Sequence, residues 1–332
     1  MAKSLSDKAS ELPDAKHAKA IEALQKRLEK AEAAAANAER LREIIDHQST
    51  LLEQRASQLF KSPKARPNVK GGHFHRVLVP DTHGAHIDPK AAAAFLGDLE
   101  YLRPREVVWL GDHLDCGGFL AEHHTLGFVA ETAFSFTDDI REGNAFLDRV
   151  QDRCQQSVHH FLTGNHEHRI QKWCCTHTLR HPKDAGLLLE KLGVQTSLNL
   201  AARGIHYYPR DYIQPGLRTR GCIKLGPCYF VHDVSIAANC TDVALNKYAA
   251  SVMFGDTHRI KVSVARKAEQ DLIAATNGCL SVHQPLWQET NVTEWSHGYG
   301  VQIVTNDGRF LHIVVPIIEG RSLLGPLLGA VK

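Results

Sequence analysis

Residues 76–86, RVLVPDTHGAH, place an apolar run directly before Asp81 and His83. In an extended chain, side chains two residues apart project to the same side, so both polar groups can reach one point in space. Residues 251–260, SVMFGDTHRI, repeat the arrangement with Asp256 and His258. The two pairs predict two strands whose ends meet at a shared centre.

Apolar runs alternate with helical patterns along much of the chain. Strands are predicted at 74–80, 106–110, 159–163, 228–232 and 251–254, and helices over 89–102, 129–156, up to about 192, and 239–250. Shorter strands follow at 261–266 and 271–276, and a hairpin over 300–318 turns at 306–308. This order predicts an α/β fold with a mixed sheet and a strand-rich C-terminal half.

Five of the apolar runs end in a short polar cluster. The clusters are DTH at 81–83, GDHLD at 111–115, GNHE at 164–167, VHD at 231–233 and GDTH at 255–258. Functional groups in α/β sheets gather at the carboxyl ends of strands, so the five clusters predict one site built from distant segments. Oxygen and nitrogen ligands without a thiolate suit manganese, iron, zinc or magnesium.

The ordered set resembles the calcineurin-like metallophosphoesterase family, whose pattern is D-x-H, GD-x-x-D, GNH-D/E, a lone His and GH-x-H. The resemblance covers residues from about 74 to 318. It implies an α/β fold, a metallophosphoesterase-type two-sheet sandwich flanked by helices. It also implies a hydrolase that binds two divalent metal ions and acts on phosphate esters.

The resemblance also implies a role for each residue that matches a motif. The implied ligands are Asp81, His83 and His258 for the first metal, Asp112 as the bridge, and Asn165 and His232 for the second metal. His166 is similar to the family's catalytic histidine, which protonates the leaving oxygen and binds no metal. Asp115 is similar to the carboxylate that hydrogen-bonds this histidine and favours its protonated form.

Asp256 departs from the family pattern, which has a histidine at this position. Three interpretations stay open: an oxygen ligand of the second metal, an acceptor that binds no metal and leaves that metal one ligand short, or a weakened centre with one metal. As a ligand, Asp256 would shift the preference towards manganese, with magnesium, iron and zinc as alternatives.

Substrate contacts are less well marked. Cys116 replaces the phosphate-binding arginine of the serine/threonine protein phosphatases, which favours a phosphodiesterase on nucleotides or nucleic acid, a class that includes nucleases, over a phosphomonoesterase. Arg169 and His123 are candidates for substrate binding, against the alternatives of a surface salt bridge and an ordinary loop histidine. A different class of function is a scaffold with a vestigial metal site.

The N-terminal 61 residues are rich in Ala, Glu, Lys, Leu and Arg. Their apolar spacing predicts a long helix that forms a coiled coil and joins copies of the chain. The alternatives are a helix packed on its own domain and a solvated single helix. Residues 62–73, with two prolines and two glycines, predict a linker to a metallophosphoesterase domain at 74–332.

The overall charge of the chain does not identify its partners. Its 332 residues carry 39 basic and 37 acidic side chains, a net charge of +2 that gives no sign of nucleic-acid or membrane binding. The eight cysteines include no C-x-x-C pair, and the first residues contain no apolar signal segment. We therefore expect reduced thiols in a cytoplasmic protein without a membrane span.

Overall fold

The computed structural model describes residues 25–28, 32, 72–117, 120, 135–178, 181–267, 270–285, 292–322 and 324. The chain forms two units, Met1–Lys61 and Ser62–Lys332. In the first unit the described residues, 25–28 and 32, are helical. The predicted long helix, its coiled-coil pairing and most of the predicted linker lie outside the described residues.

The described part of the second unit contains two β-sheets. The first has the strand order β11–β10–β1–β2–β3–β4, in which β1 to β4 run parallel and β10 pairs antiparallel with β1 and β11. Its strands are β1 (His73–Val79), β2 (Glu106–Trp109), β3 (Val158–Leu162), β4 (His206–Tyr208), β10 (Gly298–Thr305) and β11 (Phe310–Pro316). The predicted hairpin joins β10 to β11.

The second sheet has the order β5–β6–β7–β9–β8. Its strands are β5 (Cys222–Leu225), β6 (Cys228–Val231), β7 (Ser251–Phe254), β8 (Ile260–Lys267) and β9 (Gln270–Asn277). β6, β7 and β9 run parallel, and β5 and β8 pair antiparallel at the two edges. Both sheets are mixed, as the sequence predicts.

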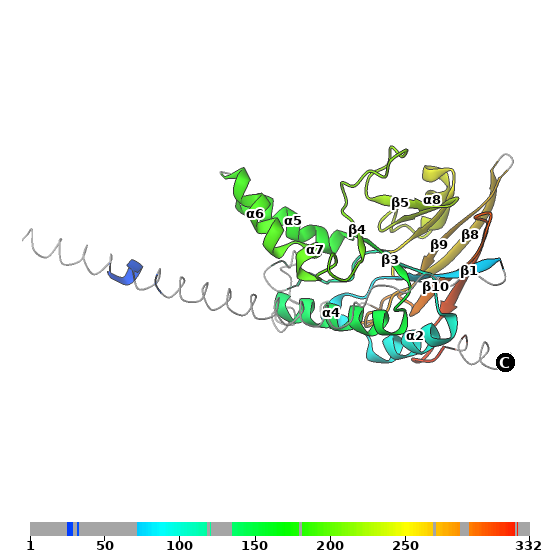
Figure 1. The fold of residues 1–332 in the computed structure, drawn as a ribbon, viewed down its shortest axis with the longest axis horizontal. Helices are drawn as coiled ribbons and strands as arrows, with labels where there is room; N and C mark the ends of the chain where they lie inside the picture. Colours follow the sequence, from blue (N-terminus) through cyan, green and yellow to red (C-terminus); the bar gives the residue numbers. More distant parts are fainter. Residues whose placement is uncertain are drawn as a thin grey trace, which may run out of the picture. The chain divides into compact units, whose positions relative to one another are not determined.

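Helices cover the outer faces of both sheets (Figure 1). The helices α2 (Pro89–Leu102) and α4 (Phe136–Arg153) pack on the first sheet, and α8 (Cys240–Tyr248) packs on the second. The remaining helices are η1 (Gly84–His86), α5 (Asn165–His177), α6 (Pro182–Leu192) and α7 (Val194–Ser197). The result is a mixed α/β sandwich of two sheets between helices.

The alternation of side chains along each strand explains these layers. On β1, Leu78 points into the cluster between the two sheets, where it joins Phe230 and Met253. Its neighbours Val77 and Val79 point the other way, into the core under α2 and α4. The buried strands are therefore apolar on both faces, which is typical of a sheet covered on both sides.

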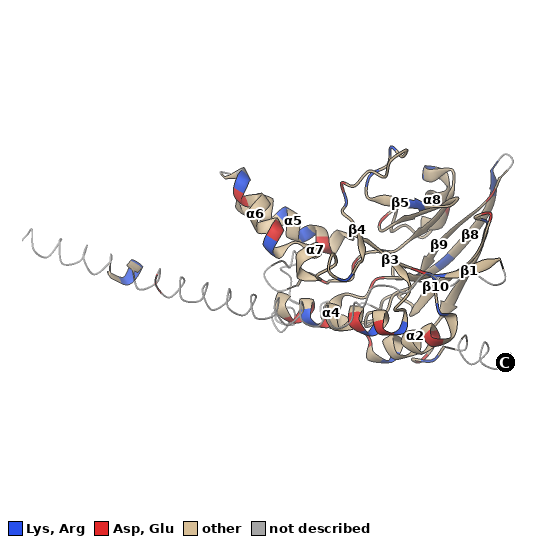
Figure 2. Ribbon diagram, viewed as in Figure 1, with Lys and Arg blue, Asp and Glu red and all other residues tan. Residues whose placement is uncertain are grey.

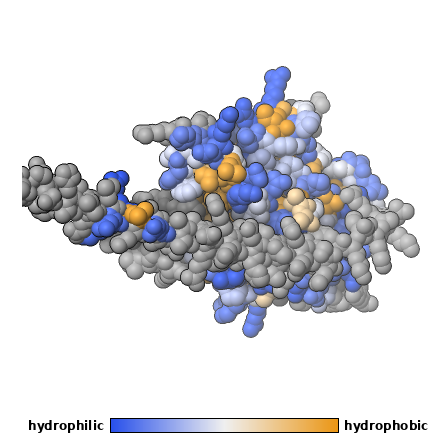
Figure 3. All heavy atoms as spheres, turned by 60° about the vertical axis from the view of Figure 1, so that its left-hand side comes forward, coloured by the Kyte–Doolittle hydropathy of each residue, from blue (hydrophilic) through white to orange (hydrophobic). Residues whose placement is uncertain are grey.

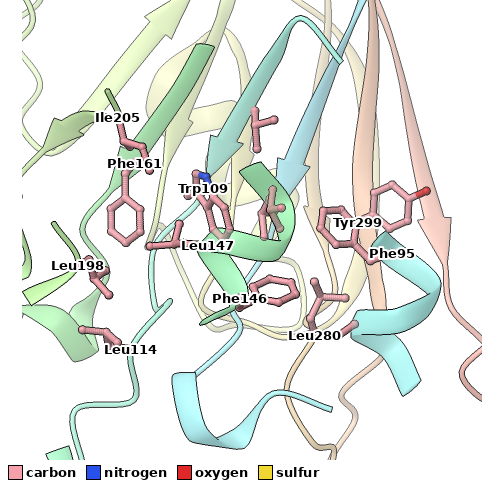
Figure 4. Close-up of a cluster of buried hydrophobic side chains, with 14 of the residues drawn as sticks. Phe95, Trp109, Leu114, Phe146, Leu147, Phe161, Leu198, Ile205, Leu280 and Tyr299 are labelled. Atoms are coloured by element: carbon pink, nitrogen blue, oxygen red, sulfur yellow. The ribbon is translucent and has the colours of Figure 1, made fainter. Parts of the chain in front are cut away.

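The core between the first sheet and its helices is rich in aromatic side chains (Figure 4). Trp109 on β2 meets Phe146 on α4 edge-to-face at 6.0 Å, and Phe95 on α2 meets Tyr299 on β10 at 5.0 Å. All four side chains are almost completely buried. This packing fixes the strands whose ends carry the polar clusters.

The start of α2 is fixed by a capping residue. The Asp88 carboxylate accepts hydrogen bonds from the backbone N–H groups of Lys90 and Ala91, and Pro89 takes the first helical position. α4 begins at Phe136 after the capping Ser135, and residues 129–134 of the predicted helix lie outside the described residues.

The described surface is mixed in charge and polarity. Acidic and basic residues interleave along α4 and α6 (Figure 2). On the face drawn in Figure 3, apolar residues gather in small patches between polar ones, as on an ordinary protein surface. Among the described helices, none is both long enough and apolar enough to cross a membrane.

Candidate metal centre

All five predicted clusters meet at one edge of the sandwich. They follow the carboxyl ends of β1, β2 and β3 in the first sheet, and of β6 and β7 in the second. Both sheets therefore contribute, because their parallel strands end on the same side. The residues brought together are Asp81, His83, Asp112, Asp115, Asn165, His166, His232, Asp256 and His258.

Asp81, His83 and His258 form the first ligand cluster. The Nε2 atom of His258 lies 3.0 Å from Asp81 Oδ2 and 3.0 Å from His83 Nε2. All three residues are buried. Burial and the charge of His166 lower the pKa of His83, so its ring is neutral and offers a nitrogen lone pair to a cation.

Asp112, Asn165 and His232 form the second ligand cluster. The Nε2 atom of His232 lies 2.7 Å from Asn165 Oδ1 and 3.3 Å from Asp112 Oδ2. Asp256 approaches the same nitrogen, with Oδ1 at 3.9 Å. The predicted ligands of the second metal are thus gathered around one nitrogen atom, and Asp256 is the outermost of them.

Asp112 lies between the two clusters. Its Oδ2 atom is 3.3 Å from His232 Nε2 and 3.9 Å from His83 Nε2. Burial alone raises the pKa of this carboxyl, but the charges of His232, His166 and His83 outweigh burial and hold the pKa below its usual range. Asp112 is therefore an ionised carboxylate with an oxygen facing both clusters.

The two clusters fit metal cations in three respects. His232 donates Nδ1–H to the Leu110 carbonyl at 2.9 Å, so its Nε2 faces two oxygen acceptors that need a ring proton or a cation between them. His83 Nε2 and His258 Nε2 face each other at 3.0 Å across a similar gap. Oδ1 of the buried Asp81 also has no hydrogen-bond partner among the described residues.

The anchoring of His83 and His232 is that of typical metal ligands. Each donates its Nδ1–H outward, His83 to Asp115 Oδ1 at 3.0 Å and His232 to a backbone carbonyl. Such contacts fix the ring orientation and the tautomer that presents Nε2 to a metal. Donor chemistry and orientation therefore both fit divalent cations.

His166 lies beside these clusters at the start of α5. Its Nδ1–H donates to the Asp115 backbone carbonyl at 2.7 Å, and Asp115 Oδ1 is 3.2 Å away. Burial on its own lowers the pKa of His166, but the charge of Asp112 and the hydrogen bond with Asp115 raise it to about 9. The ring is thus able to carry a proton at neutral pH.

Asp115 contacts more than one imidazole. Its carboxylate accepts from His83 at 3.0 Å, lies 3.2 Å from His166, and is 3.6 Å from His86 Nε2. Burial raises the pKa of Asp115, yet the hydrogen bonds from these three rings hold it well below its usual value. One ionised carboxylate therefore links a candidate metal ligand, His83, to the candidate catalytic histidine.

Of the two predicted substrate contacts, the structure describes Arg169 and does not describe His123. Arg169 is buried, and its guanidinium donates to the Asp115 carbonyl at 3.2 Å and lies 3.2 Å from His166 Nε2. It therefore lies next to Nε2 of the candidate catalytic histidine and is not part of a surface ion pair. His123 lies outside the described residues.

Cys116 is a buried neutral thiol. Burial and the charge of Asp139 raise the pKa of this thiol well above its usual value. The position that holds a cation in the protein phosphatases therefore carries no charge here.

Glu167 is a positioning residue that the sequence analysis quoted without giving it a role. The buried carboxylate accepts backbone N–H groups from Asp112, His113 and Leu114 at 2.6–3.0 Å, and from Gly164 at 2.7 Å. Burial and the charge of Asp112 raise its pKa to about 7. Glu167 thereby ties the loop after β2 to the loop after β3.

Asp139 on α4 has a similar role and no sequence motif that could have marked it. It accepts the backbone N–H groups of Asp115 at 3.1 Å and Cys116 at 2.8 Å. Burial and the charge of Asp115 raise its pKa to about 6. Two buried acids thus hold the backbone that carries the candidate ligands.

The backbone at the site is unusually strained. His83, Asp112, Asp256 and His258 all have φ between 48° and 67°, a region that residues other than glycine rarely adopt. Gly164 allows a close approach of two loops, since a Cβ there would lie 2.0 Å from Asp112 Oδ1. Strained backbone of this kind is found mainly at functional sites, where the surrounding structure holds it in place.

Known proteins add little to this description. No family model matches the sequence, and no curated protein matches it either. Among solved structures, the chain is similar to YfcE, a phosphoesterase from E. coli, at 14% sequence identity and a TM-score of 0.30. The match covers 72% of this chain and 98% of that one. A TM-score this low carries no argument about fold or activity.

Proposed function

We propose that this chain is a metal-dependent phosphoesterase that hydrolyses phosphodiesters. The observation that carries the proposal is the position of Asp112, whose Oδ2 faces His232 at 3.3 Å and His83 at 3.9 Å. A carboxylate has enough lone pairs to bind a cation on each side. With a proton-bearing imidazole beside it, this arrangement suits the hydrolysis of a phosphate ester.

Eight side-chain contacts would hold two divalent cations. Asp81, His83, Asp112 and His258 would bind the first cation, and Asp112, Asn165, His232 and Asp256 the second. Bound there, the cations supply Lewis-acid chemistry: acidification of water and neutralisation of phosphate charge.

His166 would act as the general acid. As a water oxygen bonds to phosphorus and loses a proton to solvent, the bond between phosphorus and the leaving oxygen breaks. The leaving oxygen takes the proton from Nε2 and departs as the alcohol. Nδ1–H stays on the Asp115 carbonyl at 2.7 Å, which keeps Nε2 directed at the reacting group. Asp115 holds the imidazolium by its negative charge.

Arg169 would bind the substrate phosphate. Its guanidinium already lies 3.2 Å from His166 Nε2, so an anion placed against that nitrogen also meets the arginine. The planar guanidinium can donate two parallel hydrogen bonds to phosphate oxygens. An Arg169→Lys variant should therefore raise KM more than it lowers kcat.

The preference for diesters rests on Cys116. A monoester dianion carries one more negative charge than a diester, and the buried neutral thiol does not balance it. Comparing bis-p-nitrophenyl phosphate with p-nitrophenyl phosphate in the presence of Mn²⁺ tests this preference. A strong preference for the second compound would identify a phosphomonoesterase.

The activity itself is tested by His166→Gln with a matched control on the same helix. His177 lies at the far end of α5 and is exposed, so His177→Ala should leave kcat unchanged. Loss of the general acid should lower kcat by about 10²–10⁴-fold. Metal content, measured on the same preparations, should stay at the wild-type value in both variants.

Two results would contradict a phosphoesterase. One is a metal-loaded wild-type protein that hydrolyses none of a panel of linear DNA, cyclic nucleotides, dinucleotide polyphosphates and model diesters. The other is a His166→Gln variant with wild-type kcat. The first result would favour a scaffold with a vestigial metal site.

A further inference from the structure

Cys279, His283 and His297 form a third cluster of potential metal ligands that shares no residue with the other two. One ligand atom from each lies within 4.8 Å of the others. Cys279 follows β9, His297 directly precedes β10, and His283 lies between them in the chain. We propose that these three residues bind a single transition-metal ion, zinc or one with similar ligand preferences.

The backbone that carries the cluster is held in place before any ion binds. Cys279 forms bridges with both Asp81 and His297, and its N–H donates to the Ser296 carbonyl at 2.9 Å. Ser281 bridges to Ile87 in turn. Because hydrogen bonds already order this backbone, the three residues lose little conformational entropy when they bind a metal.

His297 is oriented as a metal ligand is, and His283 lies against it. His297 places Nε2 at 2.8 Å from the Ser281 carbonyl, so Nε2–H donates outward and Nδ1 is free to bind a cation. His283 stacks on His297 with ring centroids 3.6 Å apart.

Unsatisfied buried atoms provide an independent sign of a missing ligand. His283 Nε2 has no hydrogen-bond partner among the described residues, and neither does the hydroxyl of Ser281. Ser281 is 2% exposed. Buried polar atoms without partners are rare in folded proteins and indicate an ion or a water that completes the site.

The chemistry of the three donors selects the ion. Burial raises the pKa of the Cys279 thiol to about 12, so the thiol would release its proton to solvent when a metal binds. The resulting thiolate and the two imidazoles are borderline-soft ligands that favour zinc over magnesium, calcium or manganese. The other two clusters contain no sulfur. The chain should therefore bind two chemically distinct classes of metal.

The position of the cluster suggests what the ion does. Trp295 belongs to the same connection between β9 and β10, and its ring lies edge-on to His258 at 4.2 Å. The Ser296 N–H donates to the His258 carbonyl at 2.9 Å. An ion bound to Cys279, His283 and His297 would hold this connection in place, and through Trp295 and Ser296 it would fix the position of His258.

Cobalt substitution tests the proposal without an activity assay. Full-length protein is stripped with a chelator and titrated with Co²⁺, and the near-ultraviolet charge-transfer absorption of a cobalt–thiolate bond is recorded. The wild type should show the band, and Cys279→Ser should lose it. Cys240→Ser, which alters an equally buried cysteine on α8, should keep it.

Two further variants make the result decisive. Asp112→Asn, which weakens the other two clusters, should keep the cobalt–thiolate band, so failure of the phosphoesterase proposal and failure of this one are distinguishable. His283→Gln retains the thiol but should weaken cobalt binding by at least about tenfold, and it tests the site even if Cys279→Ser does not fold. A wild type without the band, or a band that survives in Cys279→Ser, would overturn the proposal.

Discussion

Gly164 offers the sharpest test of how the metal centre is built. Its φ of −85° is ordinary for any residue, so Gly164→Ala adds no backbone strain. The new Cβ, however, would lie 2.0 Å from Asp112 Oδ1 and 2.4 Å from Asp112 N, where real Cβ contacts under 3.0 Å essentially never occur. Because Glu167 holds the Asp112 N–H at 3.0 Å, the backbone of this loop has little freedom to move away.

The expected magnitude follows from two opposing effects. Overpacking costs about 1–3 kcal/mol. Alanine also restricts the unfolded chain, which stabilises the fold by about 0.4–1 kcal/mol. Since the clash involves backbone as well as side chain, we expect Gly164→Ala to lower the free energy of unfolding by about 2 kcal/mol. The displaced Asp112 carboxylate should also weaken metal binding.

Gly97 provides a matched control within α2. A Cβ there meets nothing within 4 Å, so Gly97→Ala should raise the free energy of unfolding by about 0.5–1 kcal/mol. Urea unfolding of chelator-treated proteins measures both effects, and the Gly164→Ala midpoint should fall by roughly 1 M. A wild-type midpoint for Gly164→Ala, or shifts of the same sign in both variants, would refute the reasoning.

Three further predictions concern charge at the centre. The pKa of His166 is raised from 6.5 to about 9, so in metal-free protein its charge stabilises the fold below pH 6.5, and that stability is lost as the pH rises through 9. The stability advantage of wild type over His166→Gln should thus shrink by about 3 kcal/mol across this range in urea titrations, and a constant difference would contradict it. Glu167→Gln keeps one acceptor oxygen for four buried N–H groups and should lower the free energy of unfolding by about 2–5 kcal/mol; a loss under about 1 kcal/mol in urea unfolding would show that Glu167 does not hold the loops. Asp256→His replaces an oxygen ligand by nitrogen and should raise the ratio of zinc-supported to manganese-supported hydrolysis; an unchanged ratio of the two rates would remove Asp256 from the metal shell.

The positions of the candidate ligands could be predicted from the sequence because each belongs to a local pattern. An apolar run before Asp81 or Asp256 predicts a strand, and the end of a parallel strand determines where the next polar residues lie. Those residues then meet although the chain between them is long. The two-residue spacing that introduces His83 and His258 was therefore informative, even though both adopt left-handed backbone rather than an extended one.

The supporting contacts could not be predicted in the same way. Glu167 and Asp139 act through backbone N–H groups of distant loops, and a backbone group leaves no trace in the sequence. Their burial depends on how α4 and α5 pack, which a single sequence does not specify. The cluster around Cys279 was missed for a related reason, because the proximity of Cys279, His283 and His297 is a feature of the fold that no sequence spacing marks.

Asp115 gives the centre a property that neither of its histidine partners has alone. Its carboxylate accepts a hydrogen bond from His83 at 3.0 Å and lies 3.2 Å from His166, so the same negative charge acts on the proposed metal ligand and on the proposed proton donor. Any ion that draws electron density through His83 weakens the hold of Asp115 on the His166 proton. Thermodynamic reciprocity then requires that protonating His166 weakens the ion by the same factor. The identity of the bound metal and the pKa of His166 are therefore coupled. A change of ion in this protein should move its pH optimum as well.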